Sequence, residues 1–370
     1  MLPGVDCFCS LEKRTTLCLG FDRLVVCFQN KGAMNSLIQL RHPQRGRHVA
    51  LVDGEQLYLL DQYRSVYELA WAAVTTGEKL GEAIARERTD EVIAYEPLYS
   101  GDSEWSILPA MDHPTEPSRC RVSGTGLTHV ASAKNRDAMH VQDAKQVDEP
   151  VTDSMQMFQW GVAGGKPAPE IIGVQPEWFY KGDGSILRGH GQPLEVPAFA
   201  DDGGEEPEIA GVYLIDGNGQ PWRIGMAAGN EFADHVMERK NYLYLAPSKL
   251  RVGSIGPQLI VDGPFDDVAG QVRVERGGVV VWRQSITTGE KNMSHSIANL
   301  EHHHFKYPQH RQPGDVHIHF YGADAFSFGA GITLEHGDEM VVEWQGFGRP
   351  LRNPIYVASE QEGLVKIRTL

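Results

Sequence analysis

The chain has 370 residues, of which 41% are apolar and 22% are charged, and its formal net charge is −15. This composition is that of an ordinary globular protein and argues against a disordered, collagen-like or coiled-coil chain. The excess of acidic residues disfavours nucleic acid and anionic membrane surfaces as partners. No apolar run approaches the roughly 18 residues that cross a bilayer and no leader peptide opens the chain, so we expect a cytoplasmic protein.

The length exceeds what one hydrophobic core usually fills, so we expect more than one domain. The start of the chain lacks clear periodicity, and we predict that residues 1–33 form a poorly ordered extension. The five cysteines give no disulfide framework, because one is left over and four fall at the start of the chain. They are Cys7, Cys9, Cys18, Cys27 and Cys120. A zinc site at Cys7 and Cys9 is disfavoured, because no second close pair follows.

Residues 34–118 are predicted to form a small N-terminal α+β domain. Residues 48–61 alternate apolar and polar side chains around Asp53-Gly54, a pair typical of a hairpin turn. Residues 65–87 predict one amphipathic helix, because their apolar side chains recur at helical spacing and form one stripe. A segment with two prolines then links this domain to the next.

Residues 119–370 are predicted to form the second domain. After Asp143 this part of the chain is rich in Gly, Pro and short β-like runs, and helical patterns are few and brief. This spacing predicts a strongly bent, mixed β architecture that closes on itself, rather than a doubly wound sheet. The predicted fold class is therefore α+β, with a small N-terminal domain followed by a larger β-rich domain.

A hairpin in this second domain carries the most informative residues. Its turn is rich in Gly and Asn and lies between two arms of alternating apolar residues. Side chains two apart on a strand share a face, which places Glu206 and Glu208 together. Pairing Ile215 with Gln220 puts Glu231 on that same face, whereas a slip of one residue would send Glu231 to the other. This register predicts three converging carboxylates.

Crowded carboxylates repel one another unless a cation lies between them, and all-oxygen ligands suit Mg²⁺, Mn²⁺ or Ca²⁺ better than zinc. Pro207 cannot donate to a ladder, which suits a strand end where such a site opens to solvent. Lys249 follows a predicted helix and loop, and a lysine near a divalent ion can hold an anionic oxygen of a substrate. The alternatives are that the glutamates form a solvated acidic loop and that Lys249 is a surface cation.

Several motifs occur in an order that is specific, although each is weak alone. The Glu206-x-Glu208-Ile-Ala pattern looks like an E-x-E-[LI]-A ligand strand, and Glu231 follows an asparagine where an Asn-Asp pair is usual. Residues 177–197 contain an F-x-K, Ser, Gly and Pro segment, and residues 336–355 contain GD, a strand, G-x-G and L-x-N-P. In these features the chain resembles the fumarylacetoacetate hydrolase superfamily. The resemblance covers roughly Gly124 to Pro354, and it implies a mixed β-roll catalytic domain and a homodimer.

Within that superfamily, residues 230–249 resemble the branch of 2-keto-3-deoxy sugar acid dehydratases, which also carries Tyr-Leu before an active-site lysine at this distance. The resemblance implies that Glu206, Glu208 and Glu231 are the metal ligands. It also implies that Lys249 contacts the substrate.

The chain departs from the hydrolases of the superfamily in two places. Where they have a G-x-N-Y-x-x-H-A lid motif, this chain has residues 126–133, and Ser132 takes the slot of the histidine that activates water. The T-G-T substrate loop is also absent, and Tyr321 stands roughly in its place. Hydrolysis of a C–C bond is therefore disfavoured, and elimination of water stays open.

The resemblance thus implies a Mg²⁺-dependent dehydratase of a 2-keto-3-deoxy sugar acid, such as 2-keto-3-deoxy-pentonate converted to 2-oxoglutarate semialdehyde. A cation that chelates a 2-oxo acid makes its C3 proton acidic, and the C4 hydroxyl can then leave. The expected base is a lysine of lowered pKa or His129. Two alternatives stay open, a hydrolase that cleaves a C–C bond of a diketo acid and a non-catalytic sugar-acid-binding protein.

Histidines form two further groups. The consecutive histidines 302–304 point about 100° apart on a helix and cannot share one ion, so we expect a surface run. His317 and His319 would share one face of a strand and form a rival metal site, for which the sequence offers no obvious third ligand.

Overall fold

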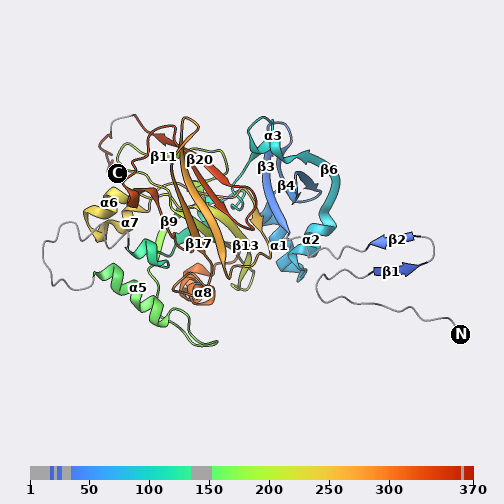
Figure 1. Ribbon diagram of the computed structural model, residues 1–370, viewed down its shortest axis with the longest axis horizontal. Helices are drawn as coiled ribbons and strands as arrows, with labels where there is room; N and C mark the ends of the chain where they lie inside the picture. The colour runs from blue at the N-terminus through green and yellow to red at the C-terminus, as the bar shows by residue number, and fades with distance from the viewer. Residues whose placement is uncertain (1–16, 21–22, 27–34, 135–151, 360–361) are drawn as a thin grey trace. The chain divides into compact units, whose positions relative to one another are not determined.

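The computed structural model describes residues 17–20, 23–26, 35–134, 152–359 and 362–370 (Figure 1). The chain divides into two compact units, Met1–Met34 and Asn35–Leu370. In the first unit, β1 (Leu17–Gly20) and β2 (Arg23–Val26) form an antiparallel pair. The extension predicted over residues 1–33 lies mostly outside the described residues and stays a prediction.

The second unit is built on a 13-stranded mixed sheet. Its main path runs through β6 (Arg88–Ala94), β5 (Gln56–Leu60), β4 (Gly46–Asp53), β3 (Ser36–His42), β15 (Leu259–Ile260), β13 (Pro221–Asn230), β12 (Pro207–Ile215), β18 (Val316–Phe320), β8 (Cys120–Gly124) and β9 (Phe179–Asp183). Off this path, β7 (Ser106–Ile107) pairs with β3, β14 (Gly253–Ile255) pairs with β13, and β10 (Leu187–Arg188) pairs with β14. The strands of residues 36–107 therefore belong to the same sheet as the later strands.

A second sheet has five strands. Its order is β11 (Leu194–Val196), β20 (Leu351–Val357), β19 (Glu339–Trp344), β16 (Val268–Arg276) and β17 (Val279–Thr288). The described chain is thus a mixed α/β fold with mostly strands and few helices, as the sequence predicts. The domain boundary predicted between residues 118 and 119 stays a prediction.

The helices are short. Those that lie entirely within the described residues are α1 (Val66–Thr76), α2 (Leu80–Glu87), α3 (Tyr95–Tyr99), α5 (Asp153–Gly164), α6 (His235–Lys240), α7 (Leu245–Ser248) and α8 (Ile297–Phe305). The 3₁₀ turns are η1 (Pro117–Arg119), η2 (Gly184–Ile186), η3 (Tyr242–Tyr244), η4 (Pro308–His310) and η5 (Ser327–Ala330). Within the described residues, none of the helices has both the length and the apolar character needed to span a bilayer.

The first helical region shows where local sequence decides the structure. The prediction of one helix over residues 65–87 is wrong, because Gly77 adopts a left-handed conformation (φ +73°) and ends α1 before α2 begins. Ser65 caps α1 by accepting a hydrogen bond from the Glu68 N–H at 3.2 Å. The predicted turn at Asp53-Gly54 is confirmed, since β4 and β5 pair around it.

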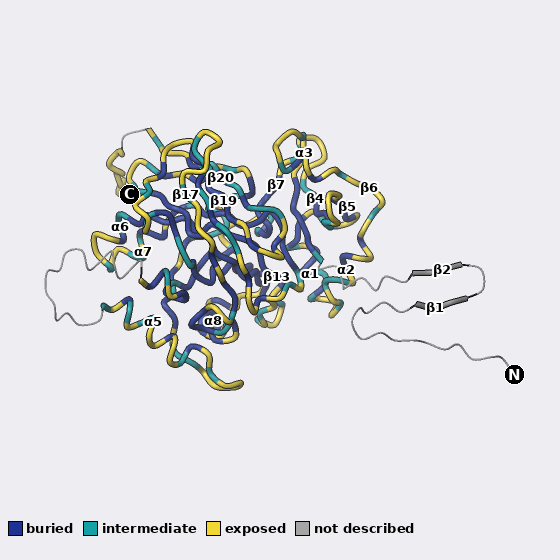
Figure 2. The backbone as a smooth tube through the Cα atoms, viewed as in Figure 1, coloured by how far each residue is buried: buried dark blue, intermediate teal, exposed yellow. Residues whose placement is uncertain are grey.

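Strand β12 lies in the interior, and all of its residues are buried. Figure 2 shows the strands in the middle of the unit in dark blue and the loops at its rim in yellow. One face of β12 presents Ala210 and Val212 to a core that includes residues of β3, α1 and β18. The other face presents Ile209 to the core between the sheets, and Tyr213 to Phe305 of α8. The two faces of β12 therefore contact different sets of side chains.

Candidate metal centre

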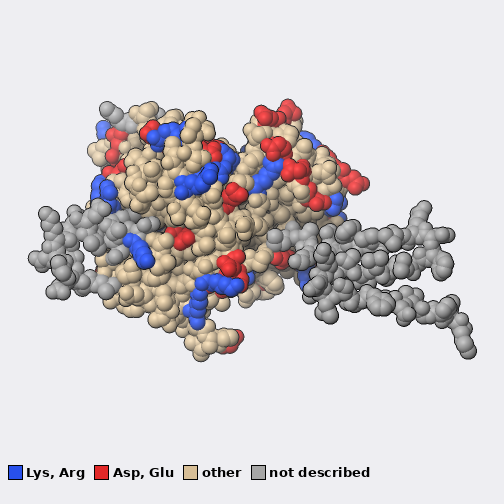
Figure 3. All heavy atoms as spheres, viewed as in Figure 1, with Lys and Arg blue, Asp and Glu red and all other residues tan. Residues whose placement is uncertain are grey.

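Three glutamates lie together at the open end of the β12–β13 hairpin. Glu208 is the second residue of β12, Glu206 directly precedes that strand, and Glu231 directly follows β13. One carboxylate oxygen of each lies within 4.8 Å of the others, and all three residues are buried. They differ in this from the acidic side chains that Figure 3 shows on the surface around α3 and β6. The convergence expected from the sequence is present, and the alternative of a solvated acidic loop is wrong.

The hairpin register, however, is not the predicted one. Ile215 pairs with Pro221 rather than Gln220, a shift of one residue, and a β-bulge after Val212 adds a second shift. The Glu231 N–H consequently donates to the Glu206 carbonyl at 2.9 Å. Two shifts of one residue restore the original alternation of faces, so the wrong register still places the carboxylates correctly.

Two buried lysines pair with these carboxylates. Lys249 Nζ, at the end of α7, donates to Glu206 Oε1 and to Glu231 Oε2, both at 2.6 Å. Lys181 Nζ, on β9, lies 2.7 Å from Glu231 Oε1 and also donates to the carbonyls of Phe232 (2.7 Å) and Lys249 (3.0 Å). The sequence predicts Lys249 in this site. Lys181 was not predicted there, although it is the lysine of the F-x-K segment.

Other groups make hydrogen bonds to these carboxylates and to the neighbouring Glu205. His235 Nε2 lies 2.9 Å from Glu206 Oε1, and this histidine was not predicted because nothing in the sequence marks its contact with the hairpin. Glu208 Oε2 accepts the Gly322 N–H at 2.6 Å. The neighbouring Glu205 is bound elsewhere, since its oxygens accept the N–H of Ser327 at 2.5 Å and its hydroxyl at 2.8 Å.

The electrostatics of the three carboxylates differ. Burial and the negative charges of Glu206 and Glu231 raise the pKa of Glu208 well above its usual range. Burial also acts to raise the pKa of Glu206, but Lys249 and His235 outweigh it, and this pKa lies well below its usual range. Burial raises the pKa of Glu231 in spite of the two lysines. Glu208 is thus the carboxylate whose negative charge is least compensated by the side chains around it.

A hard divalent cation fits this arrangement. The three side chains supply oxygen ligands at close range, as Mg²⁺, Mn²⁺ and Ca²⁺ require, and their mutual repulsion would be relieved by a bound cation. Among the described residues, no other group of three or more His, Cys, Asp or Glu side chains is close enough to hold a metal. The three glutamates therefore form a candidate binding site for a divalent cation.

The remaining predicted site residues lie apart from the carboxylate contacts. His129 hydrogen-bonds through Nδ1 to Thr128 Oγ1 (2.8 Å) and through Nε2 to Thr288 Oγ1 (3.1 Å), and burial lowers its pKa to about 3. Tyr321 lies on the opposite face of the sheet from Glu208, with its hydroxyl 2.5 Å from that of Tyr213. Ser132 is buried, and its role stays a prediction.

The histidine groups also differ from expectation. The surface run predicted at residues 302–304 is wrong for two of its members, since His303 and His304 are buried against the unit. His304 Nε2 lies 2.9 Å from His317 Nδ1, and both ring nitrogens of His319 are hydrogen-bonded to hydroxyl groups of β8 and the loop after it. The described residues therefore do not form the rival metal site.

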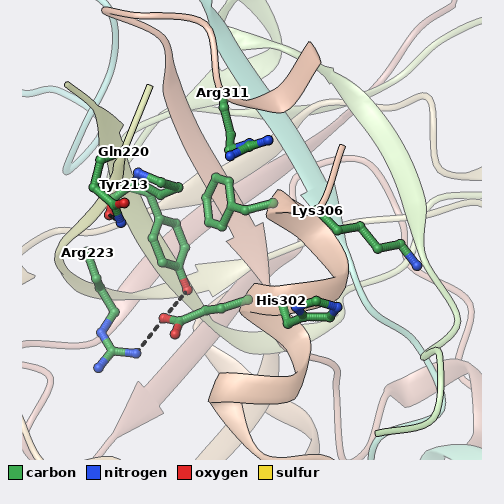
Figure 4. Close-up of a pocket in the computed structure, with 9 residues that line it drawn as sticks. Tyr213, Gln220, Arg223, His302, Lys306 and Arg311 are labelled. Carbon is green, nitrogen blue, oxygen red and sulfur yellow. Dashed lines mark hydrogen bonds and ion pairs between the residues drawn. The ribbon is translucent and has the colours of Figure 1, made fainter. Parts of the chain in front are cut away.

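One cavity of about 630 Å³ lies on the Tyr213 face of β12, not at the carboxylates (Figure 4). In it, Glu301 Oε1 accepts hydrogen bonds from the hydroxyl of Tyr213 at 3.1 Å and from Arg223 at 2.6 Å. The cavity is lined by Tyr213, Gln220, Pro221, Arg223, Glu301, His302, Phe305, Lys306 and Arg311.

Comparison with known proteins supports the fold. No protein-family model and no curated protein sequence matches the chain. Among solved structures, a hexagonal crystal form of 2-keto-3-deoxyarabinonate dehydratase aligns with a TM-score of 0.65 and 18% identity, over 88% of this chain and all of the other. The 2-keto-3-deoxy-D-arabinonate dehydratase complexed with magnesium and 2,5-dioxopentanoate aligns with a TM-score of 0.63 over the same shares, also at 18% identity.

A third similar structure is 5-carboxymethyl-2-hydroxymuconate delta-isomerase from Mycobacterium smegmatis, with a TM-score of 0.51 and 17% identity over 87% of this chain and all of the other. The chain shares the fold of these enzymes. The superfamily resemblance predicted from the sequence motifs is confirmed at the level of the fold.

Proposed function

We propose that this protein is a Mg²⁺-dependent dehydratase of a 2-keto-3-deoxy sugar acid, with Mn²⁺ or Ca²⁺ as possible replacements for Mg²⁺. The observation that carries the proposal is the buried cluster of Glu206, Glu208 and Glu231, with Lys249 donating to two of its members. The similar structure that contains magnesium and 2,5-dioxopentanoate supports this reading of the cluster. A 2-keto-3-deoxy-pentonate, converted to 2-oxoglutarate semialdehyde, is the substrate type we propose.

The three glutamates would hold the cation. When bound, the cation would supply the positive charge that makes the C3 proton of a chelated 2-oxo acid acidic. Lys181 is fixed by two main-chain carbonyls as well as by Glu231, so it holds the end of β13 and the end of α7 together. Lys249 instead donates to carboxylate oxygens of Glu206 and Glu231. A bound cation would compete with Lys249 for these carboxylates, and we therefore assign Lys249 to the anionic oxygens of the substrate.

The reaction removes a proton from C3 and the hydroxyl from C4, so that one water molecule is lost. A positive charge fixed beside the reacting oxygens stabilises the negative charge that develops on them, and Lys249 supplies such a charge in a buried site. The rings of His129 and Tyr321 make their described hydrogen bonds to threonine and tyrosine hydroxyls, so neither is assigned as the base.

The proposal is tested by assaying 2-keto-3-deoxy pentonates and hexonates with and without Mg²⁺. We expect Glu208→Gln to lose at least about 100-fold in activity, because it removes one charged ligand of three while keeping the side-chain shape. The matched control is Glu301→Gln, which changes a partly buried carboxylate that contacts the other face of β12 and is expected to stay within a few-fold of the wild type. Equal activity of the wild type and Glu208→Gln would overturn the metal assignment.

The same assay separates the alternatives. Incorporation of oxygen from labelled water into a new carboxylate would show hydrolysis of a C–C bond in place of dehydration. Thermal stabilisation by 2-oxo acids without turnover would show a binding protein. We also retain the homodimer, the role in sugar acid catabolism in the cytoplasm, and the domains 34–118 and 119–370 as parts of this proposal. Sedimentation of the full chain tests the dimer.

A further inference from the structure

His235 occupies a closely fitted slot beside the carboxylate cluster. Its ring stacks on Phe326, with centroids 4.7 Å apart and planes at 11°, and Phe328 lies against it at 5.3 Å. Gly204 closes another side of the slot, where a Cβ would lie 2.5 Å from Nδ1 of His235. The ring is 1% exposed. Packing against its neighbours therefore fixes the orientation of the ring even without its hydrogen bond.

The start of helix α6 is fixed as well. Asp234 caps this helix by accepting the Met237 N–H at 2.8 Å, and its other oxygen accepts from Arg251 at 2.9 Å. Because His235 is the first residue of α6, these contacts hold its backbone while the two phenylalanines hold its ring. The side chain is therefore rigid, as a group that positions another must be.

The two ring nitrogens of His235 are used unequally. Nε2 lies 2.9 Å from Glu206 Oε1, whereas Nδ1 is buried and has no hydrogen-bond partner in the described part of the chain. A buried polar atom without a partner destabilises the folded state, and a phenylalanine in this slot would avoid that cost. The hydrogen bond to Glu206 is thus the feature of His235 that an apolar ring could not replace.

We propose that His235 is a positioning residue for the metal, because its Nε2–H fixes the orientation of the Glu206 carboxylate. This inference rests on the proposed function. Lys249 also donates to Glu206 Oε1, but in the proposed reaction Lys249 engages the substrate, and His235 is the donor that keeps the ligand in place. Loss of a partner that orients a metal ligand typically weakens metal binding by about 10- to 100-fold.

The test uses His235→Phe in the full chain and measures Mn²⁺ binding by calorimetry and by the electron paramagnetic resonance of the bound ion. This variant keeps the ring stack and removes the donor. We expect the Kd for Mn²⁺ to rise about 10- to 100-fold while the melting temperature without metal stays equal to or above that of the wild type. The matched control is His319→Phe on the neighbouring strand β18, which makes the same change on the opposite face of the sheet and is expected to leave the Kd unchanged.

A second pair of variants covers the case in which His235→Phe does not fold. His235→Gln can still reach Glu206 with an N–H donor, whereas His235→Asn is one bond shorter. Both lack the ring, so both are expected to melt earlier, but the glutamine variant should bind Mn²⁺ at least about 5-fold more tightly than the asparagine variant. Equal affinities of this pair would overturn the inference.

The outcomes separate this inference from the proposed function. If the wild type binds no divalent cation, both fail. If the wild type binds Mn²⁺, Glu208→Gln does not, and His235→Phe binds like the wild type, the metal centre stands and the role of His235 is overturned. A lower melting temperature with unchanged affinity would show that His235 has a structural role alone.

Discussion

The two faces of β12 (Pro207–Ile215) carry buried polar side chains of different kinds. On the face continued by Glu206, the polar groups are carboxylates and ammonium groups. On the opposite face they are histidine rings and tyrosine hydroxyls, such as His319 between Ser123 and Thr125. All residues of β12 are buried, so exposure of the strand to solvent does not explain the difference.

The difference lies in how each face balances its charge. Burying an ion costs far more than burying a hydrogen-bonded neutral group. On the face continued by Glu206, here called the ionic face, positive and negative side chains alternate and so reduce this cost. The series is Lys181, Glu231, Lys249 and Glu206. Glu208 lies outside the series, so its negative charge remains to be compensated. On the opposite, neutral face the buried histidine and tyrosine side chains are balanced by hydrogen bonds, and the ion pair of Arg223 with Glu301 is partly exposed. A bound cation would therefore compensate a buried negative charge on the face that carries Glu208.

The largest expected effect comes from removing one charge of the alternating series. Lys249→Met removes the buried ammonium group that Glu206 and Glu231 share, and we expect the free energy of unfolding without metal to fall by about 3–5 kcal/mol. Glu206 then keeps only its contact with His235 among the described ion pairs, and Glu231 keeps Lys181. Saturating Mg²⁺ should restore part of this loss, because the cation replaces the missing positive charge. Chemical denaturation with and without Mg²⁺ measures both effects. The exposed Lys306→Met is the control, and a Lys249→Met variant as stable as this control would contradict the alternating series.

A second effect is expected on the neutral face, where His319 makes the free energy of unfolding depend on pH. Burial lowers the pKa of His319 to about 3, whereas the unfolded chain binds this proton near pH 6.5. The stability due to neutral His319 is therefore fully present above about pH 6.5 and is lost as pH falls towards 3. We expect His319→Phe to reduce the slope of the unfolding free energy against pH, between pH 6 and 4, by up to about 1.4 kcal/mol per pH unit. Parallel slopes for the variant and the wild type would show that the ring titrates normally.

The ionic face was largely predictable from the sequence because its logic is local. Glu206 and Glu208 are two residues apart, and Glu231 follows the same hairpin, so alternation along two strands was enough to bring them together. The bulge after Val212 could not be predicted, since it depends on how β13 packs against its other neighbours. It combined with a shift at the turn, and the two errors cancelled.

The neutral face could not be predicted in the same way. His304 and His317 come from α8 and β18, and their contact depends on how the helix packs on the sheet. The sequence therefore predicts a surface run of histidines at residues 302–304, although His303 and His304 are buried. Lys181 and His235 were missed for a similar reason, because each reaches the carboxylates from an element whose packing no short pattern reveals.

The smallest expected effect tests whether the two faces act independently. Tyr213→Phe removes the hydroxyl that donates to Glu301 Oε1 at 3.1 Å and leaves the buried Tyr321 hydroxyl without this partner. Glu301 keeps its contact with Arg223, so we expect a loss of about 1–2 kcal/mol in the free energy of unfolding. The Kd for Mn²⁺ should not change, because Tyr213 points away from Glu208 across the strand. Denaturation and calorimetry on the same sample measure the two quantities, and a weaker Mn²⁺ affinity would mean that the neutral face supports the metal ligands through β12 itself.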